Sequence, residues 1–212
     1  MTILAAVGMR AEAALLPPGI RPVVSGGDPE RLRRLLAAEA ANAGAVLSFG
    51  IAGGLDPTLA CGDLVVATRV RGPRGAWPAD MGWAAALARA AGARLGAVAG
   101  AAAVVGEPAA KRSLRVKTGA LVVDLESAVA AEFAATHGLP FAALRAVADT
   151  AAELLPRAAA AGLTPDGRPA PGRVLLALLR RPAELRPLLQ VARRSRTALA
   201  ALGRAAKALP AR

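Results

Sequence analysis

Acidic side chains follow two apolar segments of the sequence, at points where buried strands would end. Asp124 and Glu126 come after the apolar residues 120–123, and Asp149 closes the mostly apolar segment 142–148. Ligands of an open α/β sheet bind at the carboxyl ends of its strands, so these acids would face one site and could exchange protons there. Each acid also has a structural explanation, as the cap of a following helix or as a first-turn acid that stabilises its dipole.

A glycine-rich stretch at 48–57, continued by Gly62 and Asp63, could bring the backbone close to a ligand. Glycines after a strand let backbone N–H groups approach anionic or hydroxyl oxygens. The stretch contains neither the Gly-Lys-Ser/Thr of a Walker A loop nor a GxGxxG fingerprint. By itself such a turn is more often structural than phosphate-binding, so it gains weight only together with the acids.

Short apolar runs alternate with helical patterns along the chain, which predicts a single-domain, three-layer α/β fold with a mixed, mostly parallel central sheet. Asp28 followed by Pro29 gives one helix a capping residue and an N1 proline. We expect strands near 2–8, 20–25, 45–51, 63–70, 94–99, 120–124 and 140–148, and helices at 28–42, 80–91, 107–117, 125–137 and 151–161.

The C-terminal part of the chain differs in composition from the rest. We assign residues 1–164 to a catalytic domain and 165–212 to a Pro/Gly linker and Arg/Leu-rich helices that extend the same domain, broken at Pro182 and Pro187. Of the net charge of +12, most lies in 165–212, which has eleven basic residues against two acidic ones. The excess of positive charge could bind an anionic membrane or a nucleic acid. It could also reflect a GC-rich coding bias, because the chain has 24 arginines and only 3 lysines.

Composition limits the classes of site that the chain can hold. Cys61 and His137 are the single cysteine and the single histidine, so we expect neither an intramolecular disulfide nor a metal site. No signal peptide and no uninterrupted apolar run of membrane-spanning length is visible. We therefore expect a cytoplasmic protein. Aromatic residues do not interleave with the basic ones, so we expect no nucleic-acid partner.

Taken together, these segments resemble the purine nucleoside phosphorylase and nucleosidase superfamily from the first strand to about Thr150. The resemblance is carried by Ala6-Val7-Gly8-Met9-Arg10-Ala11-Glu12, Gly50-Ile51-Ala52-Gly53-Gly54-Leu55 with Gly62-Asp63-Leu64-Val65-Val66, Val123-Asp124-Leu125-Glu126-Ser127-Ala128 and Arg145-Ala146-Val147-Ala148-Asp149. It implies an oligomeric enzyme that breaks the N-glycosidic bond of a purine nucleoside without a cofactor.

The resemblance also implies roles for the acids. Bond cleavage builds positive charge on the ribose and negative charge on the departing base, as in glycoside hydrolysis. Asp149 would protonate N7 of the purine, which requires a carboxyl whose pKa burial has raised. Arg145 would orient Asp149 or the base, and Glu126 would hold the ribose hydroxyls. An acid at position 149 fits a 6-aminopurine, so we expect adenine as the base.

The nucleophile separates two versions of this chemistry. Hydrolytic nucleosidases activate water with a glutamate matching Glu12, whereas phosphorylases hold phosphate as co-substrate. We expect phosphate at Gly8, Arg10, Gly50 and Ile51, although many relatives have serine where this chain has Ile51. The other substrate-binding residues that we expect are Ala52, Gly53, Leu125 and Phe141. Phe141 or Trp83 could stack on the base, although aromatic residues at such positions more often belong to the core.

Within the superfamily, the chain most resembles the hopanoid-associated phosphorylases, which are implied to remove adenine from adenosylhopane. Residues 107–120 and the Arg/Leu-rich tail carry it. The leucines of 173–209 would line a groove for a lipid chain, or would contact the inner membrane peripherally; a helix packed on its own domain is the alternative. The other functions to weigh are a hydrolytic nucleosidase, a non-catalytic nucleoside-binding protein and a basic nucleic-acid-binding protein.

Overall fold

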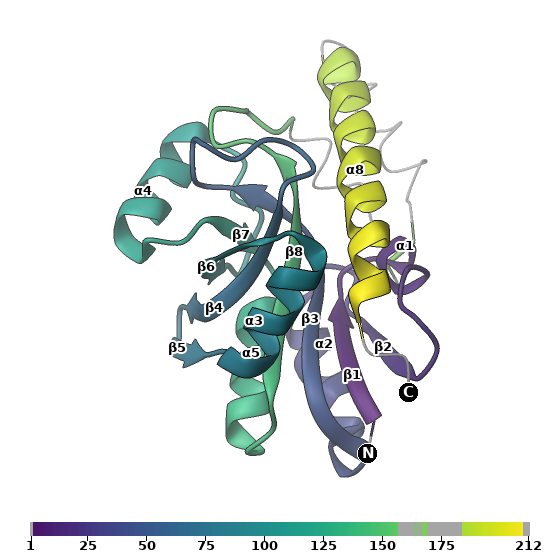
Figure 1. Ribbon diagram of the computed structural model, residues 1–212. Coiled ribbons are helices and arrows are strands. Elements are labelled where there is room, and N and C mark those ends of the chain that lie inside the picture. Colours follow the sequence, from purple (N-terminus) through teal and green to yellow (C-terminus); the bar gives the residue numbers. More distant parts are fainter. Residues whose placement is uncertain (1, 157–163, 165–166, 169–183, 210–212) are drawn as a thin grey trace.

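A computed structural model describes residues 2–156, 164, 167–168 and 184–209 (Figure 1). The described part is an α/β domain, as the sequence predicts. Its elements are β1 (Thr2–Val7), α1 (Arg10–Ala13), β2 (Ile20–Val24), α2 (Pro29–Ala38), the 3₁₀ turn η1 (Ala40–Asn42), β3 (Ala43–Gly54), β4 (Leu64–Gly72), β5 (Gly75–Pro78), α3 (Met81–Ala91), β6 (Arg94–Gly100), α4 (Pro108–Thr118), β7 (Val122–Asp124), α5 (Ser127–Thr136), β8 (Phe141–Asp149), α8 (Leu185–Ala205) and the 3₁₀ turn η3 (Ala206–Ala208).

One mixed, mostly parallel sheet joins all the described strands. Strand β3 pairs in parallel with β1 and β8, and β1 pairs in parallel with β2. Strand β4 pairs in parallel with β6 and in antiparallel fashion with β5 and β8. The short β7 lies between the end of β3, which runs antiparallel to it, and β6. The ends of β1, β3, β7 and β8 therefore meet, which places the acids that follow them around one space.

Helices cover the sheet and complete the core. Helix α5 packs against β3, β6 and β8, and α8 packs against β8 and β3. Figure 1 shows α8 running along the sheet, with its N-terminal end continuing past the strand ends. The core is rich in alanine, and its larger members include Leu4, Leu47, Phe49 and Leu144.

The helix signals act as expected where they occur. The Asp28 side chain accepts hydrogen bonds from the backbone N–H groups of Glu30 at 2.9 Å and Arg31 at 3.1 Å, and Pro29 is the first residue of α2. Helix α4 likewise begins at a proline and ends at Gly119, whose φ of 64° is left-handed. The seven predicted strands and four of the five predicted helices are confirmed, with ends that differ by a few residues.

Two predictions after β8 need correction. Residues 151–152 form a turn and 153–156 have no regular secondary structure, so the first half of the predicted helix is absent; 157–161 lie outside the described residues. Pro187 does not break the C-terminal helix, because it lies in the first turn of α8, where its missing N–H group would have no helical partner. Pro182 and the predicted helical pattern at 173–183 lie outside the described residues.

Sequence reasoning missed α1 and β5, which are both only four residues long.

Candidate active site

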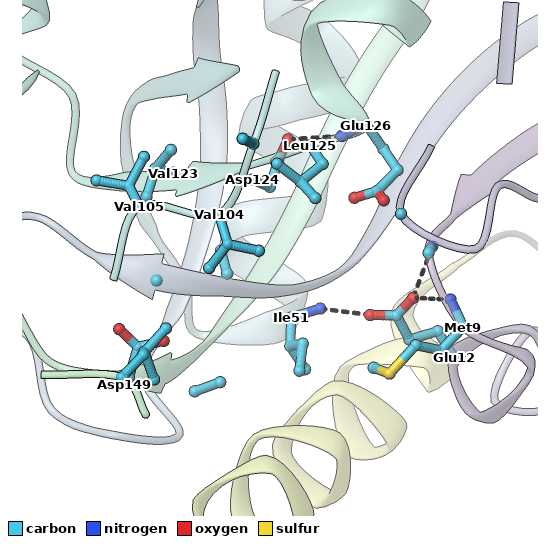
Figure 2. A pocket seen from close by; sticks show the side chains of 17 residues that line it. Met9, Glu12, Ile51, Val104, Val105, Val123, Asp124, Leu125, Glu126 and Asp149 are labelled. Atoms are coloured by element: carbon cyan, nitrogen blue, oxygen red, sulfur yellow. Dashed lines mark hydrogen bonds between the residues drawn. The ribbon is translucent and has the colours of Figure 1, made fainter. Parts of the chain in front are cut away.

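A cavity of ≈ 200 Å³ lies where the ends of β1, β3, β7 and β8 meet (Figure 2). Glu12, Glu126 and Asp149 all line it, so the structure brings together the three acids that the sequence predicts. In Figure 2, Glu12 and Asp149 lie on opposite sides of Ile51, and Glu126 lies beside Leu125. The remaining lining residues are Gly8, Met9, Gly27, Ile51, Ala52, Gly53, Val104, Val105, Ala103, Val123, Asp124, Leu125, Ala148 and Leu155.

The Glu12 carboxylate accepts three backbone hydrogen bonds. The N–H groups of Gly8 and Met9 donate to its Oε2 at 2.8 Å each, and that of Ile51 donates to its Oε1 at 2.8 Å. Glu12 is the third residue of α1, from which a glutamate side chain can turn back to the N-terminus of its own helix. Burial raises the pKa of Glu12, although Arg145 and the backbone donors oppose that rise. A buried carboxyl with a raised pKa is suited to accept a proton.

The hydrogen bonds that Glu12 accepts use two of the N–H groups predicted to hold phosphate. Gly8 and Ile51 line the cavity, but their N–H groups already donate to Glu12. Arg10 is exposed at the start of α1 and does not line the cavity. Gly50 also does not line it, because Arg145 and Glu12 cover this glycine: a Cβ there would lie 2.5 Å from Arg145 Nη1 and 2.6 Å from Glu12 Oε1. The four residues predicted to hold phosphate therefore do not form one anion site.

Arg145 is fully buried beneath the site and does not contact Asp149, which corrects the prediction that it orients that acid. Its Nε lies 2.6 Å from Asp124 Oδ2, and its Nη2 lies 3.8 Å from Glu126 Oε2. The hydroxyls of Ser48 and Ser127 accept from the same guanidinium. Within the described part of the chain its Nη1 has no hydrogen-bond partner. Arg145 supplies the positive charge that two buried carboxylates need.

The two acids after β7 have different roles. Asp124 accepts from the backbone N–H groups of Glu126 at 3.1 Å and Ser127 at 2.7 Å, so it caps α5 besides pairing with Arg145. Glu126 points into the cavity and receives a 3.1 Å hydrogen bond from the Ser25 hydroxyl. Burial raises the pKa of Glu126 to about 7, with Arg145 opposing the rise and Asp124 adding to it. Sequence reasoning missed Ser25, which lies 101 residues away in the chain.

Asp149 ends β8 and is 7% exposed. It caps no helix, since residues 151–156 are not helical, so that alternative explanation is wrong. The ammonium of the fully buried Lys111 donates to its Oδ2, to Thr150 O at 2.7 Å and to Glu153 O at 3.1 Å. Burial raises the pKa of Asp149, and Lys111 opposes that rise. Sequence reasoning missed Lys111 as well.

Neither of the two residues predicted to stack on the base lines this cavity. Phe141 begins β8, at the opposite end of the strand from Asp149, and is 3% exposed in the core. Trp83 lies on α3 and does not line the cavity. The described lining contains no aromatic side chain. A bound base would lie among aliphatic groups such as Ile51, Val104 and Leu125.

Among the described residues, no group of three or more histidine, cysteine or acidic side chains could hold a metal ion. The same part of the chain contains no helix that is both long and apolar enough to cross a bilayer.

With the geometry established, comparison with known proteins decides the family. A model described as the phosphorylase superfamily matches residues 26–180, which is more than half of the chain. The chain belongs to the phosphorylase superfamily. Its members are generally cofactor-independent enzymes, in agreement with the expectation from the sequence. No curated protein matches the sequence.

Several solved structures share the fold of this superfamily member. A 5′-methylthioadenosine/S-adenosylhomocysteine nucleosidase from Neisseria meningitidis, with methylthio-immucillin-A, aligns over 98% of this chain and 97% of its own at TM-score 0.72 and 19% identity. An S-adenosylhomocysteine nucleosidase from Streptococcus pyogenes, with 5-methylthiotubericidin, aligns over 100% and 98% at TM-score 0.69 and 18% identity. A futalosine hydrolase from Helicobacter pylori aligns over 73% and 90% at TM-score 0.64 and 19% identity.

Proposed function

We propose that this protein hydrolyses the N-glycosidic bond of an adenine nucleoside, with Glu12 activating the water. The observation that carries the proposal is the set of three backbone N–H groups that donate to the Glu12 carboxylate. Those of Gly8 and Ile51 belong to the predicted phosphate site, so phosphorolysis, the reaction expected from the sequence, would require Glu12 to move away. Hydrolysis requires no such movement, because Glu12 can activate water from the position that it occupies.

The acids serve opposite ends of the reaction. Glu126, held by Ser25, accepts hydrogen bonds from the ribose hydroxyls while positive charge develops on the sugar. Glu12 takes a proton from the water whose oxygen attacks C1′. The electron pair of the C1′–N9 bond passes to the base, and a proton from Asp149 reaches N7. The products are adenine and the free sugar, and the water supplies the new C1′–O bond.

The preference for adenine follows from the acid at the base end. A protonated carboxyl at Asp149 can donate to N7, and its second oxygen can accept from a 6-amino group. A 6-oxopurine would place an acceptor there instead. The aliphatic lining around Asp149 adds apolar contact without selecting among purines.

For the rest of the substrate, we infer a large apolar 5′ substituent and name adenosylhopane as the candidate. A second cavity of ≈ 360 Å³ adjoins the first and shares with it Ile51, Val104, Ala148, Asp149 and Leu155. Its other lining residues include Pro156 and, on α8, Val191. This second cavity supports a large 5′ substituent, and the resemblance of residues 107–120 and the tail to hopanoid-associated proteins suggests that the substituent is the hopanoid.

The N-terminal end of α8, which projects past the strand ends, supports a peripheral membrane contact, where a lipid-linked nucleoside would be found. Leu185 and Leu189 are one helical turn apart and are 49% and 54% exposed. Arg186 and Arg193 are exposed on the same helix and could meet anionic headgroups.

The test is adenine release from adenosylhopane and from adenosine, each with and without phosphate, in water enriched in ¹⁸O. The proposal expects phosphate-independent release, ¹⁸O at C1 of the sugar, and a higher kcat/KM for the hopanoid. Release that requires phosphate, with a sugar 1-phosphate as product, would establish phosphorolysis instead. Adenine binding without release from either substrate would favour a non-catalytic binding protein.

A further inference from the structure

Lys111 is the least expected charged group near the site. It is the buried residue of α4, and its ammonium is fully enclosed. An ammonium has three protons to donate, and here they are matched by the Asp149 carboxylate, Thr150 O and Glu153 O. The position of Nζ is therefore fixed by three partners.

A structural role alone accounts poorly for a cation at this place. Burying an ammonium costs several kcal/mol of desolvation, and replacing a buried ion pair with apolar groups is often neutral or stabilising. Helix α4 could pack on the sheet through an apolar residue at position 111. The carboxylate that Lys111 contacts is the one that must deliver a proton to the departing base, which gives the cation a chemical use.

We infer that Lys111 is a positioning residue for Asp149 and the reserve from which the proton given to the base is replaced. This inference rests on the proposed function. When the base departs, a proton passes from the Lys111 ammonium to Asp149, and the carboxylic acid so formed protonates N7. Lys111 is left as a neutral amine, Asp149 returns to a carboxylate, and solvent later returns one proton to the amine. The pair therefore acts as one acid.

Lys111 is placed to give Asp149 a proton as well as to hold it in position, because its ammonium donates directly to Asp149 Oδ2. Other titratable or charged groups near Asp149 are Glu107, which lines a cavity with it, the thiol of Cys61, and Glu153, which pairs with Arg194 at 2.8 Å. Arg194, the cation among these groups, pairs with Glu153 rather than donating to Asp149.

The decisive comparison is between two leaving groups in the Lys111→Met variant. Adenine must be protonated as it leaves, whereas 4-nitrophenolate leaves unprotonated from 4-nitrophenyl β-D-ribofuranoside. We expect Lys111→Met to lower turnover of the adenine nucleoside about 100-fold or more at pH 8 and to change turnover of the nitrophenyl riboside by about threefold at most. Lys117→Met, on the exposed face of α4, is the matched control and should leave both rates unchanged.

Each outcome has a separate meaning. Equal losses on both substrates, or no loss on either, would overturn the inference and leave the proposed function intact. No adenine release by the wild-type protein would defeat the proposed function itself. If Lys111→Met does not fold, the same comparison of leaving groups is made in Lys111→Gln: a loss confined to the adenine nucleoside supports the inference, and equal losses on both substrates, or no loss on either, overturn it.

Discussion

Arg145 and Asp124 form an ion pair of 2.6 Å that is closed to solvent. The pair lies beneath the cavity and joins β8 to the end of β7. Removing one member leaves the other as an uncompensated buried charge, and Glu126 and Glu12 would lose the cation that they share.

Arg145→Met should therefore destabilise the fold by about 3–5 kcal/mol. Urea unfolding at neutral pH measures the change, with Arg89→Met on the exposed face of α3 as the matched control. A loss of unfolding free energy below about 1 kcal/mol, which is the range of exposed ion pairs, would contradict the prediction that this buried pair stabilises the fold.

Glu12→Gln should lower turnover by about 10²–10⁴-fold, because an amide cannot take the proton from water. Adenine affinity should stay within about threefold of wild type, since Glu12 lies on the far side of Ile51 from Asp149. Isothermal calorimetry with adenine and single-turnover kinetics separate the two quantities. In the wild type, turnover should fall as pH drops through the raised pKa of Glu12, at a higher pH than an ordinary glutamate would give. Unchanged turnover in Glu12→Gln would remove Glu12 from the mechanism.

The pKa of Glu126, raised to about 7, predicts opposite effects of pH on binding and on stability. Ribose hydroxyls are held best by the ionised carboxylate, so nucleoside affinity should fall as pH drops below about 7. The folded state binds this proton more tightly than the unfolded state, so this group's contribution to stability should be present below pH 4.5 and be lost as pH rises through about 7.

Titration of a non-cleavable adenosine analogue, together with thermal unfolding across the same pH range, tests both signs. Glu126→Gln is the control, because its affinity should be weaker and should no longer change near pH 7. An affinity that rises as pH drops below 7 in the wild type would contradict the assignment.

Leu185→Glu combined with Leu189→Glu should weaken binding to anionic vesicles by about tenfold or more, because both leucines are half-exposed on the projecting part of α8. Flotation with vesicles of phosphatidylglycerol and phosphatidylcholine measures the effect. Gln190→Glu combined with Ala200→Glu makes the same charge change at exposed positions of α8 and should weaken binding less. Equal losses in the two double variants would mean that charge alone drives any binding.

Much of the fold was predictable because strands and helices are local patterns. Glu12, Glu126 and Asp149 could be placed together because each follows a strand, and ends of neighbouring strands meet. Lys111 and Ser25 could not be placed at the site from the sequence, since their contacts depend on where distant segments of the chain meet. A signal for Lys111 existed, because the chain has 3 lysines against 24 arginines.

The errors have physical reasons too. The aromatic type of Phe141 suggested stacking, but the strand's direction puts its start and its end at opposite edges of the sheet, and only the end carries Asp149. Gly50 was predicted to hold phosphate, whereas it makes room for the side chains of Arg145 and Glu12. The expected homo-oligomer and the division at residue 164 stay predictions.

The hydrogen bonds that the N–H groups of Met9 and Ile51 donate to Glu12 do not depend on the side chains at those two positions. Replacements at Met9 and Ile51 would therefore alter the walls of the cavity while the Glu12 carboxylate stayed in place, as long as the buried cation Arg145 is kept. If Glu12 activates water as proposed, the chain can acquire new substrates by exchanging wall residues without losing that group.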